Sequence, residues 1–471
     1  MKTIALAIFL FLYPQSFLKA QELYGFRGFD GQALQERGIE VNASFSYEHD
    51  KSQSIRWFGS DSRRTKLQFN SYVLYRIPAS YKGPASRILE DSTQLEKINE
   101  TVNLQLQHMY GSFTTHPGFE NNPGIPSGDY KVSLLSSEKV PGSDYARINY
   151  YYDDIAVFSS KIFPGGGEVK INFVLPKDPL TIYSKGFPTP SSRKNRCTDE
   201  HYNSEGDFWY FWNPYQEGCP ITGADLVGIS AVIKPLAMTA STYPEYNRLY
   251  GENGNGDTLK ISYLVGVDEN FQNGDLGKTT FINAFRILQD EGFKATVNEA
   301  RRKMLAGRAG KKKVSIEMLL LNPDSPQFAK EAVSAMKTAD IFLYDGHSGL
   351  GGHLNPERLS EDSGKQLTLP KDKYQIFVFQ GCSTYAYYNS AFFNLKKSQS
   401  DPKGTKNLDV ITTGIGAAFE VGAAVDSAFI SSIARGEKNS WQQIIRNMRR
   451  AEGELSALTH INGDEDNPRM P

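Results

Sequence analysis

Residues 341–349 of this chain read IFLYDGHSG, a short apolar run that leads to a histidine, His347. A second run, YQIFVFQGCST at 374–384, leads in the same way to a cysteine, Cys382. Continuous apolar runs of this length, bounded by glycine, are typical of strands buried on both faces. Two neighbouring parallel strands would bring the imidazole and the thiol to the carboxyl edge of one sheet, where open α/β folds place their sites. A cysteine nucleophile and its base require that arrangement.

The segments around these two runs alternate between strand and helix patterns. Strands are predicted at 259–267, 314–321, 376–379 and 408–413, and helices at 278–291, 326–338, 384–396, 417–434 and 441–456. Such alternation predicts a doubly wound parallel sheet with helices on both faces. We therefore expect residues 258–471 to form an α/β domain.

The N-terminal half has a different pattern, with short alternating runs separated by Gly, Pro, Asn and Asp. This pattern predicts an antiparallel β-sandwich within a β-rich domain, residues 21–240, and a polar, glycine-containing linker at 241–257. One stretch, 85–99, is predicted to be helical. The expected strands are 39–47, 66–75, 102–108, 130–135, 146–152, 155–161, 168–174 and 224–236.

The first twenty residues have the charged start and short apolar core of a secretory signal peptide, with a cleavage site predicted after Ala20. The apolar core is too short to cross a bilayer, and no cysteine follows it that could carry a lipid. We expect a secreted or periplasmic protein with no stable membrane span after signal cleavage. An uncleaved anchor and a buried helix are the alternatives.

The chain has three cysteines. In an oxidising compartment Cys197 and Cys219 are expected to pair and to bound a segment rich in Trp and Tyr, with a stabilisation of about 3 kcal/mol. Cys382 would then be the unpaired, reactive thiol. The alternative is that all three are reduced and Cys382 is a small buried apolar residue.

Charge and motif spacing argue against several kinds of ligand. Lys plus Arg number 52 and Asp plus Glu 53, so there is no net field to attract nucleic acid or anionic lipid. The G-K-T fragment at 277–279 lacks the glycine that a phosphate loop needs at position 272. We therefore interpret the fragment as an ordinary helix start, with nucleotide binding as the alternative.

Two groups of residues could be drawn as metal sites. His201 lies among acidic residues between two cysteines, and His347 and His353 could be joined by Cys382. Neither group has the ligand spacing of a known metal pattern, so we expect no metal and no cofactor.

Cys382 also lies where backbone geometry favours nucleophilic chemistry. It falls between a strand and a helix predicted to begin near Thr384, so the helix dipole is expected to lower the pKa of the thiol. The N–H of Cys382 could stabilise a tetrahedral oxyanion, with the N–H of Gly349 as the second donor.

These residues resemble the catalytic domain of the caspase, gingipain and legumain group of cysteine peptidases. The resemblance rests on a helix ending in Gly292-Phe293, a strand ending in His347, and the triplet Gln380-Gly381-Cys382; it covers 259–456. It implies a caspase-like fold with His347 as the catalytic histidine and Cys382 as the nucleophile. Gln380, which matches the glutamine of the group's Gln-Ala-Cys, is the substrate-pocket candidate. Ser348 stands where the group has Gly.

The sequence therefore predicts an exported cysteine endopeptidase whose Cys-His dyad cleaves a peptide or protein substrate. Glu420 or Asp426 could line a pocket for a basic side chain, or be surface charges. The alternative function is that of a catalytically inactive caspase-like scaffold acting as a secreted binding protein.

Overall fold

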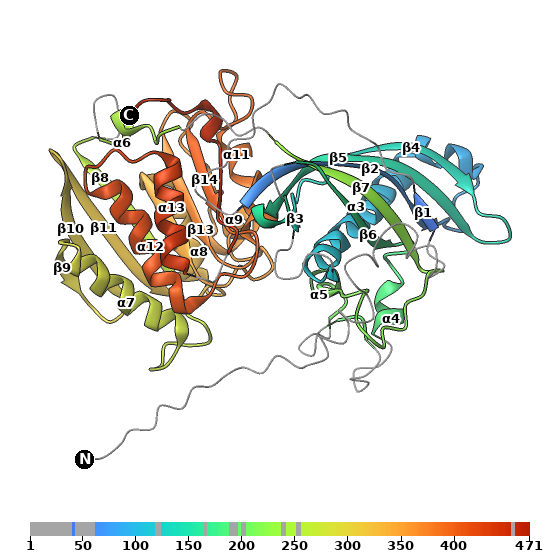
Figure 1. Ribbon diagram of the computed structural model, residues 1–471, viewed down its shortest axis with the longest axis horizontal. Helices are drawn as coiled ribbons and strands as arrows, with labels where there is room; N and C mark the ends of the chain where they lie inside the picture. Colours follow the sequence, from blue (N-terminus) through green and yellow to red (C-terminus); the bar gives the residue numbers. More distant parts are fainter. Residues whose placement is uncertain are drawn as a thin grey trace, which may run out of the picture.

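A computed structural model of the chain is shown in Figure 1. It describes residues 40–42, 62–117, 124–163, 167–187, 196–198, 204–236, 242–250, 256–453 and 457–471. The predicted signal peptide, 1–20, lies outside these residues. The described residues form two sheets with separate cores. We call residues 40–42 and 62–236 the antiparallel unit and residues 242–471 the α/β unit.

The antiparallel unit is built on a curled sheet of seven strands. Its two longest strands pair along their whole length, from Ser62↔Ser159 to Arg76↔Tyr145, and their side chains alternate between buried and partly exposed. The order is β1-β7-β2-β5-β3, with β4 also paired to β5 and β6 to β7. The strands are β1 (Glu40–Asn42), β2 (Ser62–Arg76), β3 (Gly124–Pro126), β4 (Val132–Lys139), β5 (Tyr145–Ser159), β6 (Val169–Pro176) and β7 (Leu226–Pro235).

A long helix, α3 (Ser92–Thr114), packs on this sheet and corrects two predictions. The strand predicted at 102–108 is wrong, because Val102, Leu106 and Met109 follow a helical spacing and are buried together with strand side chains. The β-sandwich is wrong as well, because one sheet folds over the helix in place of two facing sheets. The helix predicted at 85–99 is a 3₁₀ turn, η1 (Ala85–Glu90), followed by the first part of α3.

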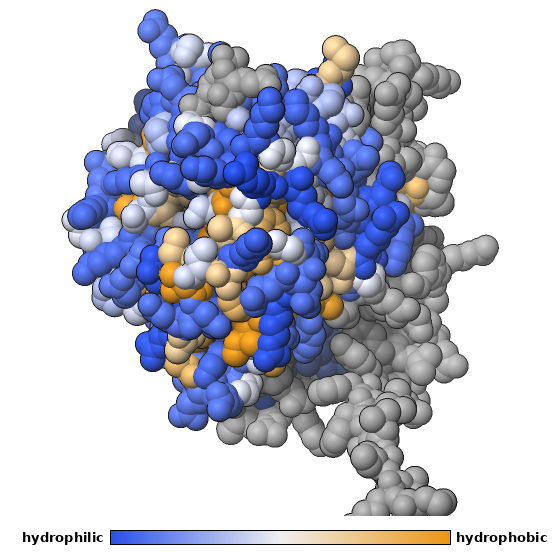
Figure 2. Space-filling model, turned by 90° about the vertical axis from the view of Figure 1, so that its left-hand side faces the viewer, coloured by the Kyte–Doolittle hydropathy of each residue, from blue (hydrophilic) through white to orange (hydrophobic). Residues whose placement is uncertain are grey.

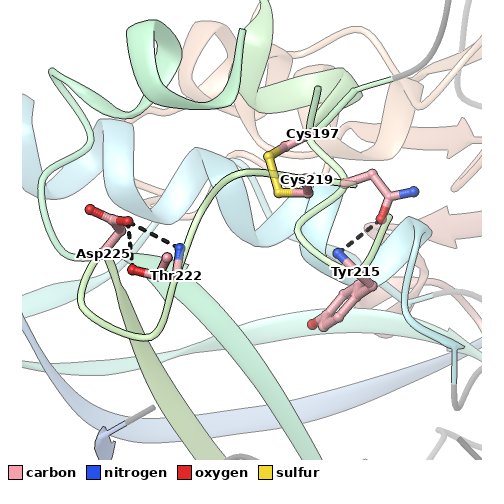
Figure 3. The surroundings of a disulfide bond; sticks show 6 residues. Cys197, Tyr215, Cys219, Thr222 and Asp225 are labelled. Carbon is pink, nitrogen blue, oxygen red and sulfur yellow. Dashed lines mark hydrogen bonds between the residues drawn. A yellow bond between two sulfur atoms is a disulfide. The ribbon is translucent and has the colours of Figure 1, made fainter. Parts of the chain in front are cut away.

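The expected disulfide between Cys197 and Cys219 is present and is shown with its surroundings in Figure 3. The turn after Cys219 is closed by Asp225, whose carboxylate accepts from the N–H and the hydroxyl of Thr222. The bridged segment contains α5 (Phe208–Phe211) and packs on α3 through the edge of the Trp212 ring against His108. The short helix α4 (Ile182–Gly186) precedes the segment.

The α/β unit has an eight-stranded mixed sheet in the order β15-β14-β13-β12-β8-β11-β10-β9. The five strands from β14 to β11 in this order are parallel, as predicted, whereas β15, β10 and β9 are antiparallel additions at the two edges. The strands are β8 (Thr258–Gly266), β9 (Lys294–Asn298), β10 (Arg302–Ala309), β11 (Lys312–Leu321), β12 (Ile341–Asp345), β13 (Gln375–Gln380), β14 (Leu408–Thr412) and β15 (His460–Asn462).

Helices cover both faces of this sheet. The front layer in Figure 1 is α7 (Leu276–Asp290), α12 (Phe419–Ala434) and α13 (Trp441–Glu452), which share one core. Residues of α8 (Pro326–Thr338), α9 (Pro356–Ser363), α10 (Thr384–Tyr388) and α11 (Ala391–Lys396) belong to the core on the other side. Along β12, Ile341 and Leu343 join the core of the front layer, and Phe342 and Tyr344 join the core behind. Burial on both faces explains why β12, β13 and β14 have no exposed residue.

The free edge of the sheet, at β9, ends the molecule on the left of Figure 1. Four of the five residues of β9 are exposed, and lysines lie on both β9 and β10. Figure 2 shows this end of the molecule as mainly hydrophilic, with a smaller apolar area near the centre of the view. Charged side chains on an edge strand oppose pairing with another chain.

None of the helices in the described part of the chain combines the length and apolar character that a membrane span needs.

The segment predicted as a linker, 241–257, lies partly in the α/β unit. Its helix α6 (Tyr246–Leu249) adds Tyr246 and Leu249 to the core of the front layer, and the Tyr246 hydroxyl donates to the Asn439 carbonyl at 2.8 Å. The two units also meet directly. Tyr110, Ile125 and Val157 of the antiparallel unit form a buried cluster with Tyr385 of the α/β unit.

Replacing one core residue of α3 tests the helix. Because Leu106 is fully buried, Leu106→Ala should lower the free energy of unfolding by about 2–5 kcal/mol. Asn103→Ala, at an exposed position of the same helix, should change it little. Urea denaturation of the full chain measures both. Equal effects of the two substitutions would contradict the helical packing.

The disulfide can be checked by counting thiols. Titration of the denatured, unreduced protein should find a single free thiol, that of Cys382, and reduction should release the other two. Finding three thiols before reduction would show that Cys197 and Cys219 are not bridged in the protein.

Candidate active site

Two adjacent strands deliver His347 and Cys382 to the same edge of the sheet. β12 and β13 are parallel and in register, with Asp345 opposite Gln380, and each reactive residue follows that pair after a single glycine. The Gly346 N–H donates to the Gln380 carbonyl at 3.0 Å, which extends the pairing past the strand ends. The glycines are needed here, because a Cβ on Gly381 would lie 2.6 Å from the Gly346 oxygen.

The His347 loop also lies where the strand order of the sheet changes direction. β8 stands between β11 and β12, and the chain leaves β8 toward β11 but leaves β12 toward β13, on the opposite side. Connections that diverge in this way open a crevice at the carboxyl ends of the two strands. Asp268 follows β8 at this edge of the sheet, and His347 follows β12.

Asp268 is a site residue that sequence reasoning missed. Its Oδ1 lies 2.7 Å from Nε2 of His347, and the two side chains are 27% and 46% exposed. A carboxylate at Nε2 orients the ring and leaves Nδ1 as the proton acceptor, with no hydrogen-bond partner among the described residues. The available signal was its position directly after the apolar strand Leu259–Val267, the same position that singled out His347 and Cys382.

The loop that carries Asp268 is closed around another carboxylate, that of Asp275. Asp275 caps α7 by accepting from the Lys278 N–H at 2.8 Å, and it also accepts from the backbone N–H groups of Asp268 and Glu269. The Lys278 ammonium is bound to the Phe271 carbonyl. The N-terminal end of α7 is therefore filled by the chain itself, which argues against the nucleotide-binding alternative.

Two side chains hold the backbone of His347 in place through its carbonyl oxygen. Its carbonyl accepts from the Tyr344 hydroxyl at 2.6 Å and lies 2.6 Å from Nδ1 of His353, whose Nε2 lies 3.2 Å from an Asp324 oxygen. His353 thus supports the loop, a role that the sequence did not predict. In the part of the chain that the structure describes, no group of three or more His, Cys, Asp or Glu side chains could hold a metal ion.

The Cys382 thiol differs from the prediction in its protonation. Burial raises the pKa of this thiol, and a hydrogen bond from the Ala417 backbone acts in the opposite direction without reversing the shift. The prediction that a helix dipole lowers the pKa of the Cys382 thiol is wrong, because α10 has only 5 residues and the thiol is poorly solvated. The loop before α12 passes close by, since a Cβ on Gly416 would lie 3.9 Å from Sγ.

The same loop leads into Phe419, whose ring lies edge-on to His347 with centroids 5.2 Å apart.

The backbone N–H groups of Cys382 and Gly349, the two oxyanion candidates, donate to no acceptor in the described residues. Gly349 is left-handed, with φ 56°, and a Cβ there would lie 2.6 Å from the His353 ring. A side chain at this position would therefore disturb the support of His347. Ser348, in place of the group's glycine, is buried, and its carbonyl accepts from the Gly351 and His353 N–H groups.

Buried polar groups lie directly beneath the site. Gln380, the substrate-pocket candidate, is only 1% exposed, and neither the nitrogen nor the oxygen of its amide has a hydrogen-bond partner among the described residues.

Asp426 is fully buried, which rules out a role as a surface charge. Its carboxylate accepts from the Tyr263 hydroxyl at 2.5 Å. Burial raises the pKa of Asp345 to about 6 and also raises the pKa of Asp426. The charge of Asp345 also raises the pKa of Asp426, and because both carboxyl groups are buried they do not line an open pocket. Glu420 is exposed.

A cavity of about 310 Å³ lies between the two units. It is lined by Asp129 of the antiparallel unit and by Glu357, Tyr387 and Ser390 of the α/β unit, but not by His347 or Cys382. The candidate residues therefore do not line this cavity. Comparison of the chain with protein-family models and with curated proteins found no match.

The protonation of Cys382 can be measured by alkylation. Because burial raises its pKa, the rate of reaction with iodoacetamide should be low at neutral pH and should rise through and beyond the usual thiol range, since only the thiolate reacts. The same thiol in urea-denatured protein is the control and should titrate at lower pH. A rate that is already at its plateau at pH 7 would contradict the raised pKa.

Proposed function

We propose that the protein is a cysteine peptidase with a caspase-like α/β unit, in which Cys382 attacks the scissile carbonyl and His347 transfers the protons. The observation that carries the proposal is the delivery of both residues by adjacent, in-register parallel strands to one edge of the sheet, with Asp268 on the imidazole. This combination supplies nucleophile, base and orienting group from three neighbouring strand ends.

The proposed reaction follows from this arrangement. As the Cys382 sulfur bonds to the peptide carbonyl carbon, its proton passes to Nδ1 of His347, and the oxyanion is stabilised by the N–H groups of Cys382 and Gly349. Collapse of the intermediate breaks the C–N bond, and the imidazolium donates its proton to the leaving amine. Water, deprotonated by His347, then hydrolyses the thioester and restores the thiol.

The raised pKa of Cys382 bears on the role of the base. A thiol that burial keeps protonated has little thiolate in the resting protein, so proton removal must accompany attack. His347 is then a general base in the step itself, and Asp268 becomes important because it stabilises the imidazolium that forms.

We also propose that the protein works outside the cytoplasm. The Cys197–Cys219 disulfide supports this, because such bonds persist in oxidising compartments. The signal-like sequence at 1–20 supports it independently. A peptide or protein is the proposed substrate.

The second candidate, a caspase-like binding protein without turnover, is favoured by two observations. Cys382 is held protonated by burial, and no hydrogen bond joins it to His347 among the described residues. An electrophilic peptide ketone distinguishes the two functions. A peptidase should become labelled at Cys382 and lose activity in proportion, whereas a binding protein should bind the peptide and leave the thiol free.

Substitution of the site residues tests the peptidase. Cys382→Ala and His347→Ala should each lower kcat/KM for a peptide substrate by about three orders of magnitude or more, and the double variant should be hardly worse, because the two residues act as one unit. Asp268→Asn should lower kcat by about tenfold, since the pair with His347 is partly exposed. Steady-state kinetics on a fluorogenic peptide library measures these changes.

Glu269→Gln is the matched control for Asp268→Asn, because Glu269 is the exposed neighbour, whereas the hydrogen bond of the His347 ring is to Asp268. It should leave kcat unchanged. If activity survives Cys382→Ala and His347→Ala intact, the active site lies elsewhere in the protein.

A further inference from the structure

The residue after the candidate nucleophile has an unusual backbone conformation. Ser383 has φ 55° and ψ 29°, in the left-handed region, and is fully buried. Few residues with a side chain adopt this conformation, and it persists only where surrounding contacts hold it. The peptide bond between Cys382 and Ser383 sets the direction of the Cys382 backbone, so the contacts of Ser383 bear directly on the reactive residue.

Two of these contacts come from the α/β unit itself. The Ser383 N–H donates to the Ile415 carbonyl at 3.3 Å, and the Ser383 carbonyl accepts from the Ala386 N–H at 2.9 Å. These bonds fix the backbone on both sides of the turn, but among the described residues of its own unit the hydroxyl of Ser383 has no partner.

The partners of that hydroxyl come from the antiparallel unit. The Ser383 Oγ forms a short hydrogen bond with the hydroxyl of Tyr110, on α3, and lies 3.2 Å from the hydroxyl of Tyr210, on α5. The two tyrosine rings stack on each other, with centroids 4.5 Å apart and 14° between their planes. Burial raises the pKa of both phenols, so they remain neutral hydrogen-bonding groups.

The position of Tyr210 is itself fixed by the disulfide-bounded segment. α5 lies between Cys197 and Cys219 in the sequence, and the Asn213 N–H donates to the Cys197 carbonyl at 2.7 Å. On the other side, the Trp209 ring meets Tyr110 edge-on, with centroids 6.0 Å apart. A continuous set of contacts thus leads from the disulfide through Tyr210 to the turn at Cys382.

We infer that Tyr110 and Tyr210 are positioning residues of the active site, through which the antiparallel unit holds the Cys382 turn in its reactive geometry. The inference rests on the proposed peptidase function for its kinetic consequence, but not for its effect on the thiol. The antiparallel unit is then a working part of the site and not a segment that can be removed without loss.

The test removes the hydroxyl groups and keeps the rings. In Tyr110→Phe/Tyr210→Phe, kcat on a peptide substrate should fall by about tenfold with KM changed by no more than about twofold, because substrate binding is left in place and the geometry of attack is not. The rate at which iodoacetamide alkylates Cys382 at fixed pH should also change. Tyr145→Phe, which loses a phenol contact to Asp178 in the same unit, is the matched control and should change neither.

Ser383→Ala shows whether the effect passes through Ser383. It should reproduce the loss of the tyrosine double variant, and adding Tyr110→Phe/Tyr210→Phe to it should change kcat and the alkylation rate by less than about twofold, because the shared hydrogen bonds are already gone. If the tyrosine substitutions instead caused a general loss of packing, they would lower the melting temperature by the same amount in the wild type and in Ser383→Ala. Their effects and that of Ser383→Ala would then be additive.

The inference is overturned if the tyrosine double variant matches Tyr145→Phe in kcat and in alkylation rate, or if its effect is undiminished in the Ser383→Ala background. If the wild-type protein cleaves no peptide, the peptidase proposal fails. The alkylation rates of the same variants then still decide whether the tyrosines position Cys382.

Discussion

The pairing of β12 with β13 is the constraint on which the candidate site depends. Because the strands are parallel and in register, the residues that follow them emerge side by side at one edge of the sheet. Gly346 and Gly381 let the two strand ends approach beyond the last paired residues. A slip of register would move His347 along the edge relative to Cys382 and would reverse the faces on which Phe342 and Leu343 are buried, so both cores oppose it.

Burial differs between the two candidate site residues. His347 is 46% exposed and is in contact with the carboxylate of Asp268 and with the ring of Phe419. Cys382 lies deeper, beneath the loop that leads into α12, and its thiol is kept neutral. The fold therefore pairs an accessible candidate base with a protected candidate nucleophile. Such a thiol is shielded from adventitious oxidation, since oxidation requires thiolate and access.

The contact between the two units is formed at the same turn. Tyr385 is buried in the shared apolar cluster, and Ser383, two residues earlier, bonds to Tyr110 and Tyr210. The backbones approach closely nearby, where a Cβ on Gly128 would lie 2.0 Å from the Ala386 oxygen. The segment that follows the candidate nucleophile is thus also the segment by which the α/β unit holds the antiparallel unit. A rearrangement of the interface would be transmitted to Cys382 through a few covalent bonds.

The sequence by itself determined the features that depend on local pattern. The apolar runs at 341–344 and 376–379 identified buried parallel strands, and cysteine count with spacing identified the Cys197–Cys219 bridge. Only the tertiary structure decided which distant groups surround those residues. The stretch 102–108 was predicted as a strand because, over a few residues, an apolar pattern can fit both the two-residue period of a strand and the 3.6-residue period of a helix. Packing against the curled sheet selects the helix. Asp268 reaches His347 because β8 and β12 are neighbours, although 79 residues separate the two side chains in the chain. The pKa of Cys382 rises because its surroundings exclude water, and the solvation of a side chain is set by the whole fold and not by the residues beside it.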